Sequence, residues 1–395
     1  MNASEIEKLT RWLMDGARSA STPMAVLSEV CERLVRAGVP LWRVAVFVRT
    51  LHPDVYGRRF LWRPGAEVQV TTADFDIEEK PDFVNNPVAM IYRSGTELRY
   101  RLDDRASGQI PFLDEMRAEG ATDYIALPLH FTDGTIHVAS WTTKQPDGFS
   151  DEQLSALQTI VVPFSRIAEI WALRRTASAL LDTYVGHRAG ERIWAGDIRR
   201  GHAEAMRAVI WLSDLRGFTT LSDRLPAETV VDILNRYFDC QVPPIRKHGG
   251  EILKFMGDGL LAVFPIARDS GNHREVCARV LDAAREARAN VVAMRYGRDE
   301  AAEGFRFGVA LHIGDILFGN IGGSGRLDFT CIGPAVNLAA RLEKIAGRLG
   351  RTVIASSGFA GLCACDWADL GEFPIAGLSS VQRVYGLRDE ATAES

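Results

Sequence analysis

The segment Gly250–Phe264 (GEILKFMGDGLLAVF) constrains the fold more than any other part of the chain. Two apolar runs flank Met256-Gly257-Asp258-Gly259, and an Asp-Gly pair between hydrophobic runs is a strong short-range signal for a β-hairpin. The pattern puts the carboxylate of Asp258 at or beside a tight turn, with Lys254 on the incoming strand. Turn aspartates commonly only cap their own backbone, so the role of Asp258 depends on the rest of the chain.

Length and composition are those of a globular protein with two or three domains. The chain has 395 residues, 47% hydrophobic and 25% charged, which is too long for one ordinary core. A net charge of −5 does not indicate a strongly basic surface that would bind nucleic acid or an anionic membrane. No window approaches the roughly 18 uninterrupted apolar residues of a membrane span, and Met1–Arg18 lacks the apolar core of a signal peptide. The six cysteines form no Cys-x-x-Cys pair. We therefore expect a soluble, cytoplasmic protein with reduced thiols and without nucleic-acid or membrane partners.

Residues 1–175 are predicted to form one mixed domain. The expected helices are Pro23–Ala37, Pro87–Tyr92 and Phe112–Glu119, and the expected strands are Trp42–Arg49, Asp123–Leu129 and Thr135–Trp141. This layout, which ends in Ala139–Ser150 (ASWTTKQPDGFS), resembles a GAF domain, a small antiparallel-sheet sensor module, with a PAS-like module as the alternative. Such a domain either binds a small-molecule ligand among aromatic residues (Trp42, Trp62, Trp141) or serves only for dimerisation. Aromatic residues at strand positions are more often part of a core.

The pattern stays helical from Asp151 to about Arg200, with a kink expected at Pro163. Gly186 and Gly190 predict a break, and we place a helical linker at residues 176–205. A helix of this length between two domains often pairs with its twin as a parallel coiled coil. The alternative is an ordinary closing helix that packs on its own sheet.

After the linker, a second aspartate is predicted to stand at a strand end beside glycine. The run Ala208–Ser213 predicts a strand that leads into Asp214, and the loop Gly217–Thr219 then precedes a helix. Amide groups in such a loop are free to face an anion. Divalent cations prefer carboxylate oxygens, so Asp214 and Asp258 together form the pattern of a two-metal phosphate site.

Two β segments, Phe305–His312 and Leu327–Ile332, are expected to bracket a loop that contains Gly314, Gly319 and Gly322. In the helix predicted over Pro334–Glu343, Asn337 and Arg341 share a face. Asn337 has poor propensity for a helix interior, which favours a functional role, whereas Arg341, Glu343 and Lys344 could also be a charged helix face. The other expected elements are a helix opened by Pro226, a helix over Arg274–Asn290, and strands over Thr352–Ala355 and Val381–Leu387.

Three segments are similar, in the right order, to the three motifs of class III nucleotidyl cyclases. They are Ser213–Thr219 (SDLRGFT), Lys254–Gly259 (KFMGDG) and Asp328–Arg341 (DFTCIGPAVNLAAR). The resemblance implies a catalytic domain at residues 206–390 with a ferredoxin-like βαββαβ core. The expected fold class is therefore α+β, with a GAF-like antiparallel-sheet domain, a long helical linker and a cyclase domain. The resemblance to class III cyclases also implies a head-to-tail homodimer that converts a nucleoside triphosphate into a 3′,5′-cyclic nucleotide and pyrophosphate.

By motif position, the resemblance also assigns roles to individual residues. Asp214, Asp258 and the backbone carbonyl of Leu215 would hold two divalent cations, Mg²⁺ or Mn²⁺. Gly217, Phe218 and Thr219 would cradle the phosphates. From the partner chain, Lys254 and Thr330 would contact the purine. Asn337 would orient the ribose, and Arg341 would stabilise charge at the α-phosphate. A homodimer would then have two equivalent sites and a monomer none.

Lys254 with Thr330 is similar to the family pattern for ATP, so the implied enzyme is an adenylate cyclase, a phosphorus–oxygen lyase, regulated by the N-terminal domain. A guanylate cyclase and a catalytically silent nucleotide-binding sensor are the alternatives. One departure lies in Pro374–Leu378 (PIAGL), where Ala376 stands where the family usually has a lysine that contacts the triphosphate. Either Arg383 or another cation substitutes, or the triphosphate is bound more weakly.

Overall fold

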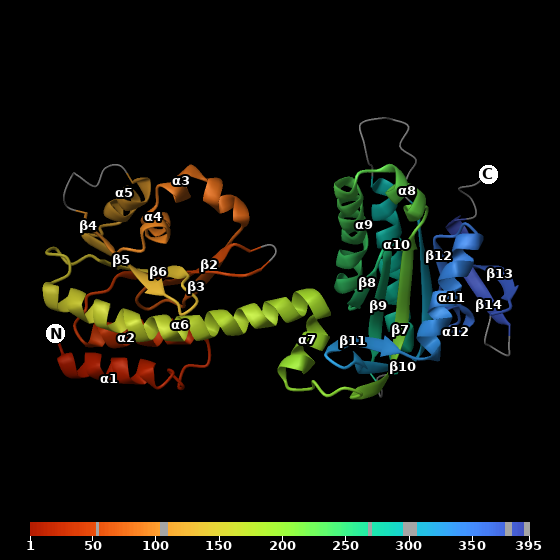
Figure 1. The fold of residues 1–395 in the computed structure, drawn as a ribbon, viewed down its shortest axis with the longest axis horizontal. Helices are drawn as coiled ribbons and strands as arrows, with labels where there is room; N and C mark the ends of the chain where they lie inside the picture. Colours follow the sequence, from red (N-terminus) through yellow and green to blue (C-terminus); the bar gives the residue numbers. More distant parts are fainter. Residues whose placement is uncertain (53–54, 103–109, 268–270, 295–305, 376–380, 391–395) are drawn as a thin grey trace. The chain divides into compact units, whose positions relative to one another are not determined.

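A computed structural model describes residues 1–52, 55–102, 110–267, 271–294, 306–375 and 381–390 (Figure 1). The chain divides into two compact units, Met1–Leu180 and Leu181–Ser395. Each unit contains both helices and a sheet, so the mixed α+β class expected from the sequence is confirmed. The finer division at residues 175 and 205 stays a prediction.

The first unit is a six-stranded antiparallel sheet with helices on both faces (Figure 1). The strands, in the order β3-β2-β1-β6-β5-β4, are β1 Arg43–Arg49, β2 Gly57–Trp62, β3 Gln69–Ala73, β4 Leu98–Arg101, β5 Asp123–His130 and β6 Ile136–Thr143. Helices α1 (Ala3–Met14), α2 (Pro23–Arg36) and α6 (Asp151–Val185) cover one face. On the other face lie α3 (Pro81–Val84), α4 (Pro87–Ser94) and α5 (Pro111–Ala118).

The three tryptophans suggested as a ligand pocket do not share one environment. Trp62 and Trp141 are buried in the core between the sheet and helices α2 and α6. Trp42 instead packs with the residues on the α4–α5 side, where Arg63 and Lys144 approach its ring to 5.2 and 4.1 Å. The idea of a pocket built from all three is therefore wrong, because Trp42, which precedes β1, belongs to the core on the α4–α5 side, whereas Trp62 and Trp141 belong to the other core.

The α4–α5 face of the sheet carries a buried positive charge. Arg43 is only 3% exposed and stands in register with Thr142 on the neighbouring strand. Its Nη1 atom and the Thr142 hydroxyl have no hydrogen-bond partner among the described residues. Burial lowers the pKa of the Arg43 guanidinium to about 10. The charge of Glu119 opposes this shift, and the guanidinium lies 5.6 Å from the centre of the Phe112 ring. Arg43 forms no ion pair with any described residue, and a buried charge without an ion pair is costly.

Helix α6 has two different halves. In its first half, Ala156, Leu157, Ile160, Phe164 and Ile167 belong to the core of the first unit, and Pro163 lies inside the helix without ending it. Its second half exposes apolar side chains, including those of Ile170, Leu173 and Tyr184. By length and composition alone α6 could cross a membrane, the one such helix in the described part of the chain, but a core helix passes the same test.

The break expected at the end of the long helix lies at Gly186, where φ is +89°. Helix α7 (His187–Trp194) starts immediately afterwards and contains Gly190. The break expected near Gly186 and Gly190 is therefore confirmed, and Gly190 itself lies inside α7. A Cβ at this position would lie 2.9 Å from Asp182 Oδ1 and 3.1 Å from Leu181 Cβ, so Gly190 permits close packing of α7 on the end of α6.

After α7, the second unit continues with the element order βαββαβ. These elements are β7 Ala203–Leu215, α8 Phe218–Arg224 with α9 Ala227–Lys247, β8 Glu251–Met256, β9 Gly259–Ile266, α10 His273–Ala293 and β10 Phe307–Gly323. Within the sheet β13-β14-β12-β10-β7-β9-β8, the four strands of this core are antiparallel neighbours. The remaining elements are β11 Arg326–Ile332, α11 Pro334–Arg348, β12 Val353–Ser356, α12 Ser357–Ala360, β13 Trp367–Phe373 and β14 Gln382–Leu387.

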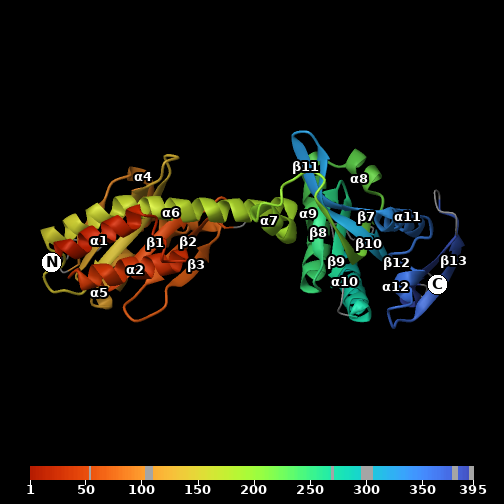
Figure 2. The same cartoon turned by 90° about the horizontal axis from the view of Figure 1, so that it is seen from below.

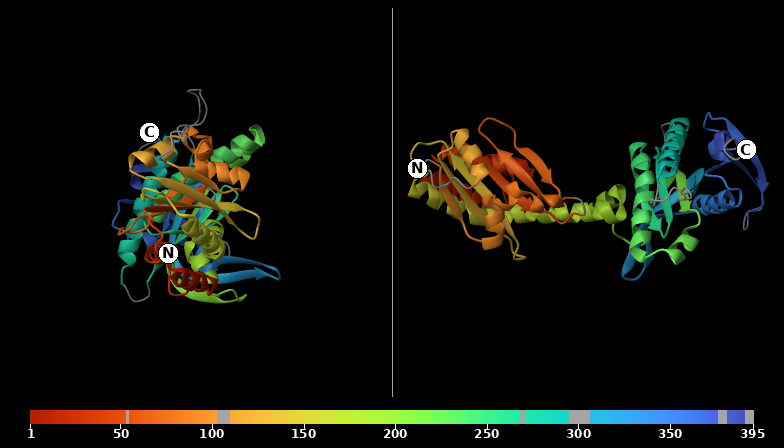
Figure 3. Two further views of the ribbon diagram at one scale, coloured as in Figure 1. Left: turned by 90° about the vertical axis from the view of Figure 1, so that its left-hand side faces the viewer. Right: turned by 90° about the horizontal axis from the view of Figure 1, so that it is seen from above.

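Helices cover both faces of this second sheet. Helices α9 and α10 lie side by side on one face (Figures 2 and 3). Helix α11 packs on the other face, where Leu342, Ile345 and Ala346 form a core with Ala310 of β10. The neighbours of Ala310 on the strand, Val309 and Leu311, point to the α10 side, as the two-residue period of a strand requires.

The hairpin expected around Asp258 is confirmed. Met256 pairs with Gly259, so Gly257 and Asp258 are the two turn residues and Gly259 already belongs to β9. Gly257 has φ +68°, a conformation that favours glycine. The turn residues thus lie one position earlier than the Asp-Gly pair alone would suggest.

The loop expected around Gly314, Gly319 and Gly322 is wrong, because all three lie inside the 17-residue strand β10. A Cβ on Gly314 would lie 2.5 Å from the Cβ of Ala335, and one on Gly319 would overlap the carbonyl oxygen of His202. These glycines permit close packing and do not break the strand. Residue 305, where this strand was expected to begin, lies outside the described residues.

Candidate active site

Asp214 and Asp258 meet at one edge of the second sheet. Asp214 is the penultimate residue of β7, and Asp258 is in the β8–β9 turn. Strand β7 pairs with β9 through Ser213 and Leu260, which brings its end against that turn. Gly259 makes this approach possible, since a Cβ there would lie 3.2 Å from the Ser213 carbonyl oxygen and 3.9 Å from Asp214 Oδ1.

The two carboxylates affect each other electrostatically. The pKa of Asp258 is raised to about 6, mainly because burial penalises the charged form, and then because the Asp214 carboxylate lies within hydrogen-bonding reach and is also negative. Two carboxylates that share a site resist simultaneous ionisation. A divalent cation with its preference for oxygen ligands would relieve this repulsion, so the donor set fits a metal site.

The segment after Asp214 takes the expected form of a strand, a loop and a helix. Leu215 is buried, and Gly217, with φ +75°, is followed directly by helix α8. Phe218 packs partly on the core, whereas Gly217 and Thr219 are exposed. Of the loop predicted over Gly217–Thr219, only Gly217 precedes the helix, and Phe218 and Thr219 are the first two residues of α8. All three residues stand at the same end of β7 as the Asp214 carboxylate.

Lys254 and Thr330 are also brought to one place, because strands β8 and β11 contact each other. The Nζ atom of Lys254 lies 3.5 Å from Oδ2 of Asp328, two residues before Thr330. Thr330 is 6% exposed, and its hydroxyl has no hydrogen-bond partner among the described residues. Sequence reasoning missed Asp328 as a partner of Lys254, although this aspartate opens the third motif segment.

Asn337 and Arg341 lie one turn apart on helix α11, which starts with Pro334 after Gly333. Asn337 is exposed and Arg341 is half-buried. In the described part of the chain, no hydrogen bond or ion pair joins either residue to Asp214 or Asp258. Among the described residues, the two halves of the predicted site are therefore joined by neither a hydrogen bond nor an ion pair.

A second group that sequence reasoning missed lies behind Asp214. The guanidinium Nη1 of Arg216 is 2.8 Å from Oε1 of Glu343, and Nη2 donates a hydrogen bond of 3.3 Å to the Glu343 carbonyl oxygen. Glu343 is only 7% exposed. Burial raises its pKa, Arg216 opposes this, and the negative charge of Asp214 adds to it. The interpretation of Glu343 as part of a charged helix face is therefore wrong.

The position where a triphosphate-contacting lysine was missing, Ala376, lies outside the described residues. Arg383, the suggested substitute, donates a hydrogen bond of 2.9 Å from Nε to Asp369. The two residues stand on the paired strands β14 and β13. Arg383 is therefore already engaged by a carboxylate.

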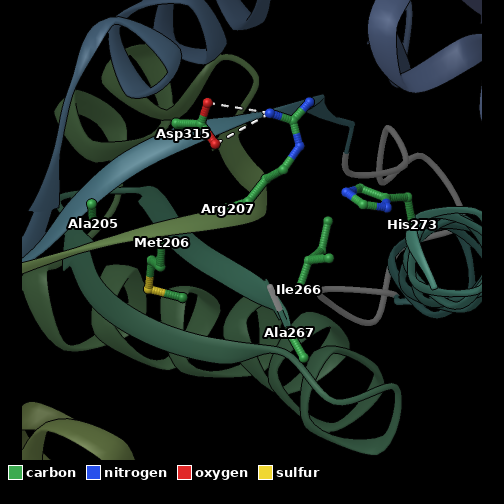
Figure 4. A pocket seen from close by; sticks show the side chains of 7 residues that line it. All are labelled: Ala205, Met206, Arg207, Ile266, Ala267, His273 and Asp315. Atoms are coloured by element: carbon green, nitrogen blue, oxygen red, sulfur yellow. Dashed lines mark hydrogen bonds and ion pairs between the residues drawn. The ribbon is translucent and has the colours of Figure 1, made fainter. Parts of the chain in front are cut away.

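A pocket of about 220 Å³ lies at the other end of β7 (Figure 4). Arg207 stands in register there with Ile266, the last residue of β9, and its Nη1 atom is 3.2 Å from both carboxylate oxygens of Asp315. The remaining lining residues are Ala205, Met206, Ala267 and His273. None of the residues predicted from the motifs lines this pocket.

The second unit is similar in sequence to proteins of one family. Residues 202–382 match the family model of the adenylate and guanylate cyclase catalytic domain. The chain is 30% identical over 164 residues to an adenylate cyclase of Anabaena cylindrica and 30% identical over 205 residues to adenylate cyclase 1 of Rhizobium meliloti. The matches cover 40% and 51% of this chain but only 31% and 29% of the relatives. The chain thus spans less than a third of the length of these two relatives.

Among solved structures, the adenylyl cyclase CyaB from P. aeruginosa is similar, with 26% identity and a TM-score of 0.39. That match covers 47% of this chain and 95% of CyaB. The family model and the curated relatives together support a class III adenylate and guanylate cyclase catalytic domain over residues 202–382.

Proposed function

We propose that this protein is an adenylate cyclase that converts ATP into 3′,5′-cyclic AMP and pyrophosphate at a homodimer interface. The observation that carries the proposal is the Asp214–Asp258 carboxylate pair, at one sheet edge of a unit that matches the cyclase family. The proposal includes regulation by the N-terminal unit, which we take to be a GAF-like domain.

Asp214, Asp258 and the carbonyl of Leu215 would hold two divalent cations, Mg²⁺ or Mn²⁺. When bound, these ions would supply activation of the ribose 3′-hydroxyl and neutralise charge on the triphosphate. The chain itself supplies closely spaced carboxylates whose repulsion a cation relieves. Gly217, Phe218 and Thr219 would contact the phosphates of the substrate, next to these two carboxylates.

Lys254 and Thr330 would select adenine. An ammonium group only donates hydrogen bonds, which suits the N1 acceptor of adenine and not the N1–H donor of guanine. The Thr330 hydroxyl, which is buried and has no hydrogen-bond partner among the described residues, would accept a hydrogen bond from the adenine amino group. On α11, Asn337 would orient the ribose, and the guanidinium of Arg341 would stabilise the charge that develops at the α-phosphate.

Two observations support a dimer in which each site takes residues from both chains. First, no hydrogen bond or ion pair among the described residues joins Asn337 or Arg341 to the aspartate pair. Second, strands β8 and β11 expose large apolar side chains, with Phe255 52% and Ile332 45% exposed. Such exposure favours burial against a second copy. The second half of α6, which exposes Ile170, Leu173 and Tyr184, would pair with its twin in a parallel coiled coil.

For the N-terminal unit, the buried charge of Arg43, which has no ion pair among the described residues, supports a small anionic ligand on the α4–α5 face. A purely dimerising unit is the alternative. A fragment that begins at Leu181 tests the regulation, because α7 belongs with the catalytic unit: Arg188 N donates a 2.9 Å hydrogen bond to Glu251, and Ala189 is buried beside β7. We expect the fragment to differ from the full chain in specific activity or in the protein concentration that it needs. Identical activity at all concentrations would exclude coupling.

The decisive experiment incubates the full chain with ATP and with GTP in the presence of Mn²⁺ or Mg²⁺. We expect cyclic AMP from ATP, and no cyclic AMP from the Asp214→Ala or Asp258→Ala variants, which should remain dimeric in light scattering. Asp239→Ala, at an exposed position on α9, is the matched control. Cyclic GMP alone would indicate a guanylate cyclase. Nucleotide binding without any product would indicate a silent sensor.

A further inference from the structure

The ion pair between Arg216 and Glu343 joins parts of the second unit that are far apart in sequence. Arg216 is the second residue after Asp214, and its backbone N–H donates a 2.8 Å hydrogen bond to the Arg306 carbonyl oxygen, which extends the pairing of β7 with β10. Its side chain reaches helix α11, where it contacts both the carboxylate and the carbonyl oxygen of Glu343. Arg216 therefore holds the end of β7 to β10 and to α11 at once.

Two glycines provide the space for this guanidinium group. A Cβ on Gly308 of β10, the residue in register with Asp214, would overlap Nη2 of Arg216. A Cβ on Gly347 of α11 would lie 2.7 Å from Nη1. The arginine is thus enclosed between a strand and a helix, each of which lacks a side chain at the point of contact.

The ion pair lies between the two functional parts of the chain. On one side is Asp214, whose charge contributes to the raised pKa of Glu343. On the other side is helix α11, which carries Asn337 and Arg341 on the turns before Glu343. In the proposed head-to-tail dimer, Asp214 of one chain serves one site, whereas Asn337 and Arg341 of the same chain serve the other.

We propose that Arg216 and Glu343 are positioning residues that fix the metal-binding end of β7 and helix α11 as one rigid piece. Through them, the carboxylate half of one active site and the Asn337–Arg341 half of the other keep a fixed geometry. This inference rests on the proposed function and assigns a role to two residues that take no part in substrate contact.

The first test separates positioning from simple stabilisation. Glu343→Gln leaves the guanidinium of Arg216 without its counter-charge and should lower Tm. The double variant Arg216→Met/Glu343→Leu removes both charges at similar volume, and such replacements generally restore stability. We expect the double variant to recover most of the lost Tm and still to bind Mn²⁺ about tenfold or more weakly, as changes behind metal ligands typically do. Mn²⁺ binding is measured by electron paramagnetic resonance in the presence of 3′-deoxy-ATP, which lacks the attacking hydroxyl.

If the double variant regained wild-type Tm together with wild-type Mn²⁺ affinity and kcat, the pair would be only structural and the proposal would be wrong. Asp232→Asn/Arg236→Met is the matched control. It removes an exposed ion pair of 2.9 Å on α9, and it should change neither Mn²⁺ affinity nor kcat.

A second test asks whether the Arg216–Glu343 ion pair positions both the carboxylate half and the Asn337–Arg341 half of the active sites. An Asp214→Ala chain supplies only the Asn337–Arg341 half, and an Asn337→Ala chain supplies only the carboxylate half, so their mixture should form dimers with one complete site. Arg216→Met/Glu343→Leu is then added to either chain. We expect each placement to lower the activity of the mixture about tenfold or more, because small misplacements of reacting groups are costly.

A loss confined to one placement would overturn the coupling of the two halves. If the unmodified mixture formed no cyclic nucleotide, the proposed function or its dimer would fail instead. The Mn²⁺ measurement on the full chain would still decide whether Arg216 and Glu343 position the carboxylates, so the two failures are distinguishable.

Discussion

The ammonium group of Lys254 lies 3.5 Å from the carboxylate of Asp328, on the strand that also carries Thr330. Residues two apart on a strand point to the same face, so Asp328 and Thr330 flank the region that Lys254 reaches. Asp328 therefore restrains the lysine that we propose contacts the purine. The pair is partly exposed, with 36% of the Lys254 side chain accessible.

Asp328→Asn should weaken the preference for ATP over GTP. Without its carboxylate partner, Lys254 becomes free to adopt other rotamers, and a partly exposed ion pair of this kind contributes up to about 1 kcal/mol, or roughly a fivefold effect. The ratio of kcat/KM for ATP and GTP measures it. Glu286→Gln breaks a comparable lysine–carboxylate pair, 2.9 Å from Lys247, and should leave the ratio unchanged. An unaltered ratio in Asp328→Asn would exclude the restraint.

Thr330→Val should raise the stability of the protein and lower its catalytic efficiency with ATP. The buried hydroxyl has no partner among the described residues, and an unpaired buried polar group costs about 1–3 kcal/mol. The valine variant should therefore unfold at a higher denaturant concentration, while its kcat/KM for ATP falls about threefold to tenfold through loss of one hydrogen bond. Thr142→Val removes an equally buried, unpartnered hydroxyl from the first unit. It should add stability without changing kcat/KM, and a parallel loss of activity in both variants would contradict the role of Thr330.

His312 should give the second unit a pH-dependent stability. Burial lowers the pKa of His312 from 6.5 to about 4, and the charge of Arg207 adds to this. Its neutral ring is held by a 2.8 Å contact between Nδ1 and Ser356 Oγ. The stability that it contributes is complete above the unfolded value and is lost as the pH falls from 6.5 towards about 4.

His312→Gln should therefore flatten the fall in the free energy of unfolding below pH 6.5, by up to one proton, or about 1.4 kcal/mol per pH unit. Urea unfolding of the metal-free protein at several pH values measures the slope. His137, whose pKa burial lowers to about 4 in the first unit, offers a matched variant. His137→Gln should flatten the transition of that unit and leave the second unit unaffected. A His312→Gln slope identical to that of the wild type would rule the mechanism out.

Arg43→Met should stabilise the ligand-free protein. The arginine is buried without an ion pair among the described residues, and methionine fills a similar volume without the desolvation cost of a charge. We expect the free energy of unfolding of the first unit to rise by about 1 kcal/mol or more. Arg63→Met is the comparison, because Arg63 is half-exposed and pairs with Glu119 at 3.1 Å. A destabilised Arg43→Met variant would mean that the charge is already compensated, and would remove the support for an anionic ligand.

Local patterns allowed the elements around the site to be predicted from the sequence. The turn at Asp258 follows from glycines between two apolar runs, and the start of α11 at Pro334 follows from the fixed φ of proline at a first helical position. In both places the deciding interactions lie within a few residues. The motif resemblance added which carboxylates belong together, which spacing alone left open.

The predictions that were wrong concern positions whose structure depends on residues far away in the sequence. Gly314 and Gly319 suggested a loop, yet each is a contact point for a residue elsewhere in the chain, Ala335 and His202 respectively. Glu343 matched an exposed helix face until Arg216, 127 positions away, supplied its counter-charge. No local pattern carries that information, because burial of a glutamate depends on which cation the fold delivers to it.

Gly347→Ala is the most specific check on the fit of Arg216. In the last turn of α11, alanine should be favoured over glycine by about 1 kcal/mol on helix propensity alone. Its Cβ would lie 2.7 Å from Arg216 Nη1, so the guanidinium must move away from Glu343. We therefore expect Gly347→Ala to destabilise the wild type but to stabilise the Arg216→Met/Glu343→Leu variant. Gly358→Ala, whose Cβ would meet nothing closer than 3.5 Å, should have the same sign in both backgrounds. Urea unfolding gives the coupling free energy between Gly347→Ala and the Arg216→Met/Glu343→Leu pair, which measures how tightly β10 and α11 enclose the arginine. Additive effects on the free energy of unfolding would show that the enclosure is loose.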